Sequence, residues 1–446
     1  MLRIGPLLKR TDVRAYIGHS WEVAWPMTLI MFYEFLVGLT DVYVAGRVGK
    51  DIQATYGFVV QQYFILIVIA NALTVGTVSV VSRLFTSGNK EELSEAIFSS
   101  LLSSAAAGVI LAGLGYSLAP WVVGFLNVPP EIKELSAPFI RVYAAGLLFH
   151  YVLINSNGVL RSCGMIKTSL KTMTTVCLVN IALNLFFVFE TPLGYRGIAV
   201  ATATAVCVGS LMNLHYVRSR LIGTRRFSRA LIKRMFNIGW PMGALQILWQ
   251  LGSMALFLIL SILPEHRVEV LAALTTGLRL ESAIFLPAFA FNMANAVVIG
   301  NCLGERRPDD AYKNGLVTMM IGVGIVSALS LAVILNARWI VPLLSHNEIV
   351  MKETMWYIYI NMIGEPIMAS GVILGGGLSG AGDTRSVLAR IAVSVWLVRI
   401  PLCYVFVVLF GFGPVSVWWA MNISQAVQAF LVYRRYSSRV WLAKLV

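Results

Sequence analysis

Charged residues are scarce in this 446-residue chain. They make up 13% of the sequence, whereas an ordinary soluble domain contains about 25%. Apolar residues account for 58%, and the mean hydropathy is +0.77. These values exclude an ordinary soluble domain, and we expect most of the molecular surface to face lipid rather than water.

The sequence also lacks the signatures of disulfide scaffolds, zinc sites and hydrolytic enzymes. Its five cysteines fall within or beside apolar runs and show no CxxC spacing, so they indicate neither a disulfide framework nor a zinc site. The five histidines are scattered, and no HExxH or GxSxG motif occurs. We therefore expect neither an enzyme nor a resident cofactor.

Positive charge is in excess, but its distribution does not indicate a nucleic-acid partner. The formal net charge is +14, and the Lys and Arg residues lie between apolar runs rather than on a separate polar face. Residues 1–20 include basic residues but no long apolar stretch, so we expect no cleaved secretory signal.

Apolar runs of roughly 20 residues, the length needed to cross a bilayer, recur along the whole chain. Their number predicts an all-α polytopic membrane protein with twelve transmembrane helices. The predicted spans are 21–46, 55–81, 96–120, 138–160, 168–189, 196–217, 237–262, 270–299, 314–336, 354–378, 386–410 and 414–433.

Basic segments predict the orientation in the membrane. Lys and Arg are dense in 218–236, and the tail 434–446 is also basic. Because basic residues next to spans are retained in the cytoplasm, we predict that these segments and residues 1–20 are cytoplasmic, in a protein of the inner membrane. Between them lie two predicted lobes of six spans each, 21–217 and 237–433.

The two lobes repeat each other in sequence. The repeated pairs are Trp25-Pro26-Met27 with Trp240-Pro241-Met242, Gly88 with Gly304, LRSCGMIKTSL at 160–170 with LSGAGDTRSVL at 378–388, and GIAVA at 197–201 with SVWWA at 416–420. The members of each pair lie 215 to 219 residues apart. A repeat of six spans predicts two pseudo-symmetric six-helix bundles with a substrate path between them. Such a chain forms its path alone, so we expect a monomer.

With these features the sequence resembles the multidrug and toxic-compound extrusion (MATE) family. The resemblance rests on Pro26, on TDVYVAGRVG at the end of the first span, on the Gly-containing acidic loop after the second, on LSGAGDT after the tenth, and on the 6+6 organisation. It covers essentially the whole chain. It implies an antiporter that expels small organic compounds, commonly cations, in exchange for Na⁺ or H⁺.

Intramembrane carboxylates are the first candidates for binding the coupling ion, because a buried carboxylate is costly unless it pairs, binds a cation or takes a proton. Asp41 lies in an apolar stretch near the end of the first span, and Glu34 lies two helical turns earlier on the same face. Asn180 and Asn184 share a face of the fifth span, and Thr202 lies in the sixth. Their oxygens suit a hard cation such as Na⁺. Alternatively, Asp41 is a solvated helix-end residue and the others are packing groups.

The MATE resemblance implies that Asp41, Asn180, Asn184 and Thr202 form an ion or proton site. One branch of the family often has aspartate at the position resembling Asn184. The amide here argues against a proton relay between two acids, and leaves Asp41 to titrate alone or with Glu34.

The second lobe contains a further set of charged residues within its spans. These are Arg279 and Glu281 in the eighth span, Glu365 in the tenth and Arg399 in the eleventh. Two residues apart on a helix, Arg279 and Glu281 point to different faces, so each needs a partner from another helix. They are either structural ion pairs or groups lining a cavity. No acid occurs in 237–263, where another branch of the family carries a glutamate.

Pro26 has two interpretations. Inside a helix it removes a backbone hydrogen bond and permits a hinge, whereas in the first turn it has no such effect. The resemblance implies that a bend at this proline responds to the state of Asp41.

The favoured prediction is therefore an ion-coupled exporter of small organic compounds. The alternative is a flippase for a lipid-linked saccharide, which would need a cavity rich in Arg and Lys to hold pyrophosphate. Arg279 and Arg399 are the main basic residues well inside the spans, which favours the exporter.

Overall fold

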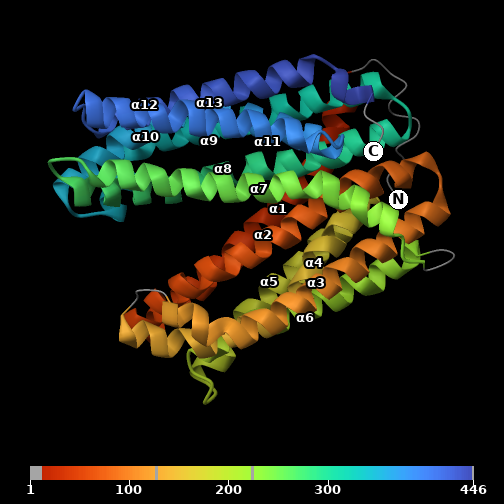
Figure 1. Ribbon diagram of the computed structural model, residues 1–446, viewed down its shortest axis with the longest axis horizontal. Helices are drawn as coiled ribbons and strands as arrows, with labels where there is room; N and C mark the ends of the chain where they lie inside the picture. Colours follow the sequence, from red (N-terminus) through yellow and green to blue (C-terminus); the bar gives the residue numbers. More distant parts are fainter. Residues whose placement is uncertain (1–12, 126–128, 222–225, 444–446) are drawn as a thin grey trace. The chain divides into compact units, whose positions relative to one another are not determined.

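The computed structural model describes residues 13–125, 129–221 and 226–443, and the regular structure in these ranges is helical throughout (Figure 1). The helices are α1 (Val13–Val48), α2 (Lys50–Ser87), α3 (Lys90–Phe125), α4 (Pro130–Ser162), α5 (Ile166–Phe189), α6 (Arg196–Val217), η2 (Arg218–Arg220), α7 (Arg229–Ser261), α8 (Arg267–Gly304), α9 (Pro308–Leu344), α10 (Glu348–Gly380), α11 (Thr384–Ala392), η3 (Val393–Arg399), α12 (Ile400–Tyr404), η4 (Val405–Leu409), α13 (Pro414–Ser437) and η5 (Val440–Ala443).

The predicted all-α fold with twelve long helices is confirmed. The run from α11 to η4 is one continuous helix, Thr384–Leu409, in which η3 and η4 are π-helical. Pro401 explains part of this widening, because it has no N–H to donate to the preceding turn. Within the described residues, eleven helices are long and apolar enough to cross a membrane. The twelfth, α13, is less apolar because it buries polar side chains such as Gln425 and Gln428.

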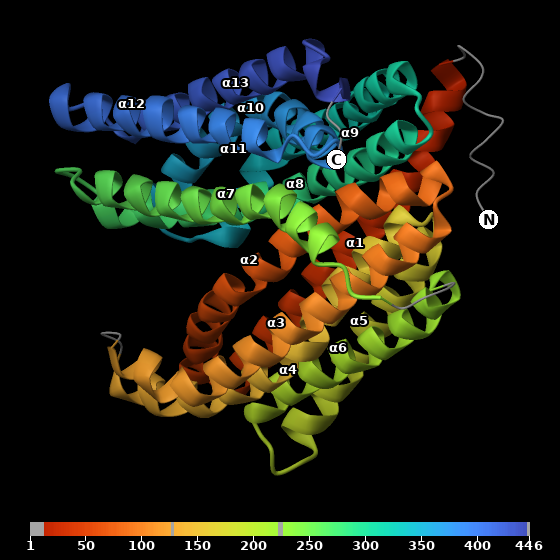
Figure 2. The same cartoon turned by 45° about the vertical axis from the view of Figure 1, so that its right-hand side comes forward.

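Each half of the chain forms a bundle around one central helix. In the first half α4 packs against α2, α3 and α6, and Figure 2 shows α3, α4 and α6 side by side. In the second half α10 packs in the same way against α8, α9 and α13. The central helices begin at Pro130 and Glu348, 218 residues apart, and have equal lengths of 33 residues. The sequence repeat is thus a repeat of structure.

The turns between helices show the same repeat. Gly164 and Gly382, which follow the two central helices, both have positive φ, at 72° and 81°. Gly88 after α2 also has a left-handed conformation, with φ 84°. After α8, however, this conformation falls on Arg306 (φ 57°) rather than on Gly304. The structural equivalent of Gly88 is therefore two residues further along than the sequence match indicated.

The chain divides into two compact units whose boundaries lie inside helices. Unit 1 contains residues 29–240, and unit 2 contains 241–443 together with 13–28. The start of α1 belongs to unit 2, where Tyr16 donates a hydrogen bond to Asp310 at 2.8 Å and Ser20 bonds Thr318 at 2.8 Å. The same exchange occurs in the second half of the chain, where the start of α7 belongs to unit 1.

In unit 1 the start of α7 crosses α2 with the two backbones in contact. A Cβ atom added at Gly239 would overlap the carbonyl of Ala72, and one added at Gly76 would overlap the carbonyl of Met235. Small residues four apart on α2 and at the crossing point of α7 permit this approach, as in many membrane helix pairs. The Ser228 backbone amide donates a hydrogen bond to the hydroxyl of Ser99 on α3. Arg234 forms an ion pair with Glu92, also on α3.

Helices extend into two segments that the sequence assigned to cytoplasmic connections. Residues 13–20 are the first turns of α1, and 229–236 are the first turns of α7. Residues 1–12 and 222–225 lie outside the described ranges.

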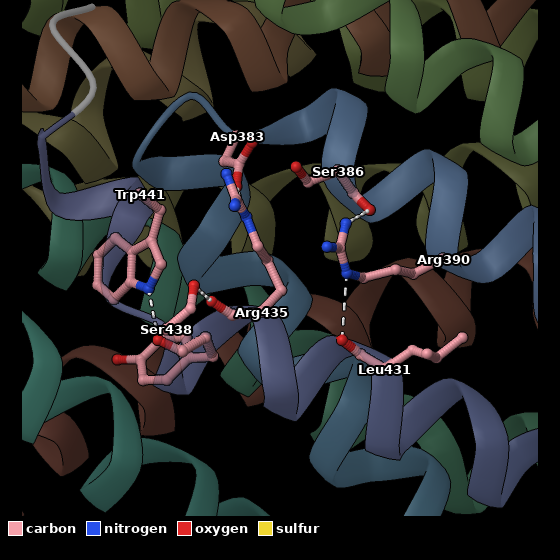
Figure 3. A network of polar contacts seen from close by, with 8 residues as sticks. Asp383, Ser386, Arg390, Leu431, Arg435, Ser438 and Trp441 are labelled. Carbon is pink, nitrogen blue, oxygen red and sulfur yellow. Dashed lines mark hydrogen bonds and ion pairs between the residues drawn. The ribbon is translucent and has the colours of Figure 1, made fainter.

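The tail of unit 2 is fixed by polar contacts to α11 and the turn before it (Figure 3). Arg435 forms an ion pair with the fully buried Asp383, with 2.7 Å between Nε and Oδ2. Arg390 donates hydrogen bonds to the carbonyls of Leu431 and Ser386 at 3.1 and 2.8 Å. These contacts hold the end of α13 against α11.

Candidate ion-binding site

Three helices of unit 1, α2, α5 and α6, bring polar side chains to Asp41, near the end of α1. Asp41 itself is 2% exposed. Its Oδ1 accepts hydrogen bonds from Asn184 at 2.7 Å and Asn180 at 3.5 Å, and its Oδ2 accepts from Thr202 at 3.0 Å and Tyr56 at 3.4 Å. A carboxylate at this depth would otherwise lose several kcal/mol of hydration, so these donors replace water.

The donors also bond one another and form a closed ring with the carboxylate. Asn184 donates to Asn180 Oδ1 at 3.1 Å, and Asn180 donates to Thr202 Oγ1 at 3.1 Å. Every donor in the ring points toward Asp41 or toward the next member, which is the arrangement that suits an ionised carboxylate. Protonation of Asp41 would require at least one donor to turn away.

Asn184 has an oxygen without a partner at this site. The side chain is fully buried, and its Oδ1 receives no hydrogen bond from the described residues. An unpaired buried acceptor costs free energy unless water or a cation approaches it. The carboxylate, amide and hydroxyl oxygens gathered here are the ligand types that hard cations prefer, so the residues present fit a small cation as well as a proton.

The structure thus brings together Asp41, Asn180, Asn184 and Thr202. Glu34, by contrast, is exposed, and no hydrogen bond within the described ranges joins it to Asp41. It interacts electrostatically with Arg161, a buried residue at the end of α4. Sequence reasoning missed Tyr56, because a tyrosine inside an apolar helix gives no signal of the partner it meets from another helix.

In unit 2, three of the four predicted charged residues gather in a second buried cluster. Glu281 accepts a hydrogen bond from the Tyr357 hydroxyl, and the buried Glu365 carboxyl interacts electrostatically with Glu281. Arg399 interacts electrostatically with Glu281.

Further contacts fix Arg399 at the end of the π-helical segment η3. Its Nε donates to Ser424 at 2.8 Å, and its guanidinium lies 5.4 Å from the centre of the Trp249 ring. Arg279 is exposed on α8 and takes no part in the cluster. The opposite facing of Arg279 and Glu281 therefore follows the helical spacing noted in the sequence.

Pro26 lies well inside α1 rather than in its first turn. The backbone hydrogen bond that it removes is therefore missing from the helix interior. The boundary between the two units falls two residues later, after Thr28, and the corresponding boundary in α7 falls just before Pro241. Both prolines thus lie where a helix passes from one unit to the other.

The helical bundles define a multi-pass membrane protein, and their outer faces carry large apolar side chains such as Leu335, Trp339 and Leu343, which are 72–83% exposed. The MatE family model matches residues 26–186 and 241–405. The chain belongs to this family of membrane transporters.

Two relatives and one solved structure show the extent of the similarity. The chain is 23% identical to "Uncharacterized transporter YisQ" of Bacillus subtilis (strain 168), over 95% of each chain. It is 25% identical to "Probable multidrug resistance protein NorM" of Bradyrhizobium diazoefficiens, over 93% of this chain and 92% of the relative. A MOP superfamily transporter from Pyrococcus furiosus has the same fold, with a TM-score of 0.89, 21% identity and 98% coverage of both chains.

Proposed function

We propose that this transporter is a secondary active antiporter, which exports small organic compounds, often cationic, in exchange for Na⁺ or H⁺. Alternating access of the two bundles carries the substrate outward. Asp41, Asn180, Asn184 and Thr202 bind the coupling ion. The chain works as a monomer in the inner membrane with both termini cytoplasmic, and it has no nucleic-acid partner.

The observation that carries the proposal is the environment of the Asp41 carboxylate. It is buried, it is held by neutral donors, and none of the ion pairs among the described residues includes it. A buried carboxylate without a cationic partner gains most from a mobile cation or a proton. Binding and release of that ion alter the hydrogen-bond ring, and a difference in affinity between two conformations couples the ion to transport.

Asn184 simplifies the ion-binding step. Because an amide occupies this position, Asp41 is the one carboxylate in the hydrogen-bond ring, and each cycle exchanges a single charge there. The second cluster, around Glu281, Glu365 and Arg399, supports the second bundle or lines its cavity. The flippase alternative receives no support from the relatives described above.

Dye efflux from proteoliposomes tests this function. Purified protein is reconstituted, a cationic fluorescent dye is loaded, and a Na⁺ gradient or a pH gradient is imposed separately. We expect one gradient to drive dye transport, and Asp41→Asn to abolish it while the protein remains folded and inserted.

Asp51→Asn is the matched control, because Asp51 is an exposed carboxylate in the first turn of α2. It should transport at the wild-type rate. Gradient-driven efflux by Asp41→Asn at the wild-type rate would remove Asp41 from the mechanism, and wild-type protein that responds to neither gradient would refute antiport.

A further inference from the structure

Unit 1 contains another buried polar cluster, which lies at the opposite end of this unit from Asp41. Asn155 donates to Thr77 at 2.9 Å, and Asn213 donates to Ser156 at 3.0 Å and to Asn157 at 2.8 Å. Ser169 donates to the same Asn157 oxygen at 2.8 Å. These residues, here called the inner cluster, come from α2, α4, α5 and α6, and all are at most 6% exposed.

The inner cluster has more acceptors than its own donors satisfy. Asn155 Oδ1 and Asn213 Oδ1 receive no hydrogen bond from the described residues, and neither does the hydroxyl of Thr172, which lies one turn from Ser169 on α5; these side chains are at most 1% exposed. Buried acceptors without a protein partner are commonly satisfied by ordered water. The cluster offers only neutral oxygens, and the nearby Arg161 disfavours a resting cation, since its Nε bonds the Asn157 carbonyl at 3.2 Å.

On α5 and α6, the inner cluster and the Asp41 site lie on the same helix faces. On α5, Asn184 and Asn180 are followed toward the helix start by Val176, Thr172 and Ser169, at helical spacing. On α6, Thr202 is followed by Val206, Gly209 and Asn213. On both helices a polar site is followed by an apolar segment and then by a second polar site. Along the axis of α5, Asn180 and Thr172 are separated by about 12 Å.

An apolar layer closes the interval between the two polar sites. It contains Leu153, Val176 and Val206, with Ile30 from α1, in one contiguous buried cluster. Gly209 packs directly against this layer, because a Cβ there would overlap Val176 and approach Leu153 to 3.1 Å. A dry layer of this kind stops water and ions. Ile30 lies one turn beyond Pro26, so a bend of α1 would withdraw one of its members.

We propose that the inner cluster is a water-filled station through which protons leave Asp41 for the cytoplasmic side, inside the first bundle, with the apolar layer of Leu153, Val176, Val206 and Ile30 as the gate. This proposal rests on the proposed function and assigns it the proton as coupling ion. Water carries the proton between the two sites when the layer opens. The positive charge of Arg161 prevents the proton from remaining in the inner cluster.

A leak assay tests the gate. Val176→Ser makes the layer smaller and polar, and we expect proton influx into liposomes without substrate to rise about tenfold, since the apolar barrier falls. Val81→Ser is the matched control, an equally buried valine of α2 outside the layer. The leak should disappear in the double variant Val176→Ser/Asp41→Asn. No rise in Val176→Ser, or a rise that persists without Asp41, would overturn the proposal.

A second pair of variants tests the inner cluster itself. Asn213→Val should lower the maximal rate of proton-driven dye transport without changing the proton concentration for half-maximal rate, and Asn213→Ser should restore the rate. A normal maximal rate in Asn213→Val contradicts the station. Wild-type dye transport separates the two ideas: if it is absent the proposed function fails, and if it is present without the leak only the proton path fails.

Discussion

The contact between α2 and α7 allows one structural prediction to be worked out in detail. In Gly239→Ala the new methyl group would lie 2.9 Å from the Ala72 carbonyl carbon and closer still to its oxygen. Both are backbone atoms and cannot rotate away, so the start of α7 must shift from α2. Overpacking of this kind costs about 2–3 kcal/mol, while alanine gains about 1 kcal/mol of helix propensity over glycine. The expected net loss is about 1–2 kcal/mol.

Thermal stability of the detergent-solubilised protein measures this loss. We expect the midpoint, followed as the monodisperse fraction after heating, to fall by a few degrees. Gly113→Ala is the control, because nothing lies within 4 Å of a Cβ at that position, and it should keep or raise the midpoint. Gly76→Ala should resemble Gly239→Ala, and the double variant should lose less than the sum, since both changes separate the same two helices. An unchanged midpoint in Gly239→Ala would refute the close crossing.

Three further predictions concern single residues. Asn184→Ala removes the shortest hydrogen bond to Asp41, and such a bond to a charged acceptor is worth about 1.5–3 kcal/mol. The apparent affinity for the coupling ion in efflux assays should therefore change by about 10- to 100-fold. An unchanged affinity would contradict the hydrogen-bond ring around Asp41. Arg306→Gly relieves a left-handed conformation and should raise the thermal midpoint by an amount equivalent to about 1 kcal/mol; a lower midpoint would show that the Arg306 side chain is needed. Burial raises the pKa of the Cys163 thiol to about 12, so maleimide labelling of Cys163 should be absent at pH 7–9. The exposed control Ser219→Cys should label faster as the pH rises over the same range. Labelling of native Cys163 at the rate of the control would refute its burial.

The fold was largely predictable because apolar length and the internal repeat act over long stretches of sequence. The bilayer sets the length of every span, and the repeat extends to equal central helices at Pro130 and Glu348. Helix ends were less predictable: α1 and α7 begin before their apolar runs, since helices continue beyond the hydrocarbon layer. The left-handed turn at Arg306 could not be foreseen, because the sequence offers Gly304 as the more suitable residue.

The composition of the Asp41 site followed from residue chemistry and from the family resemblance. Its geometry did not, because Tyr56 reaches Asp41 from a separate helix and nothing local marks it. Helical spacing alone did not predict the partner of Glu34. Glu34 and Asp41 lie two turns apart on the same face of α1, yet the Glu34 side chain interacts with Arg161 rather than with Asp41. The inner cluster was not predicted, since asparagines and serines spread over three helices have no common pattern in sequence.

The exchange of helix starts between the two units has a consequence for biosynthesis. When the ribosome has completed residue 217, the first bundle still lacks residues 229–240, and these come from the second half of the chain. Until α7 is synthesised, the nascent first half therefore lacks the partner that covers Ala72 and Gly76 of α2. Synthesis at about 5–20 residues per second makes this interval brief.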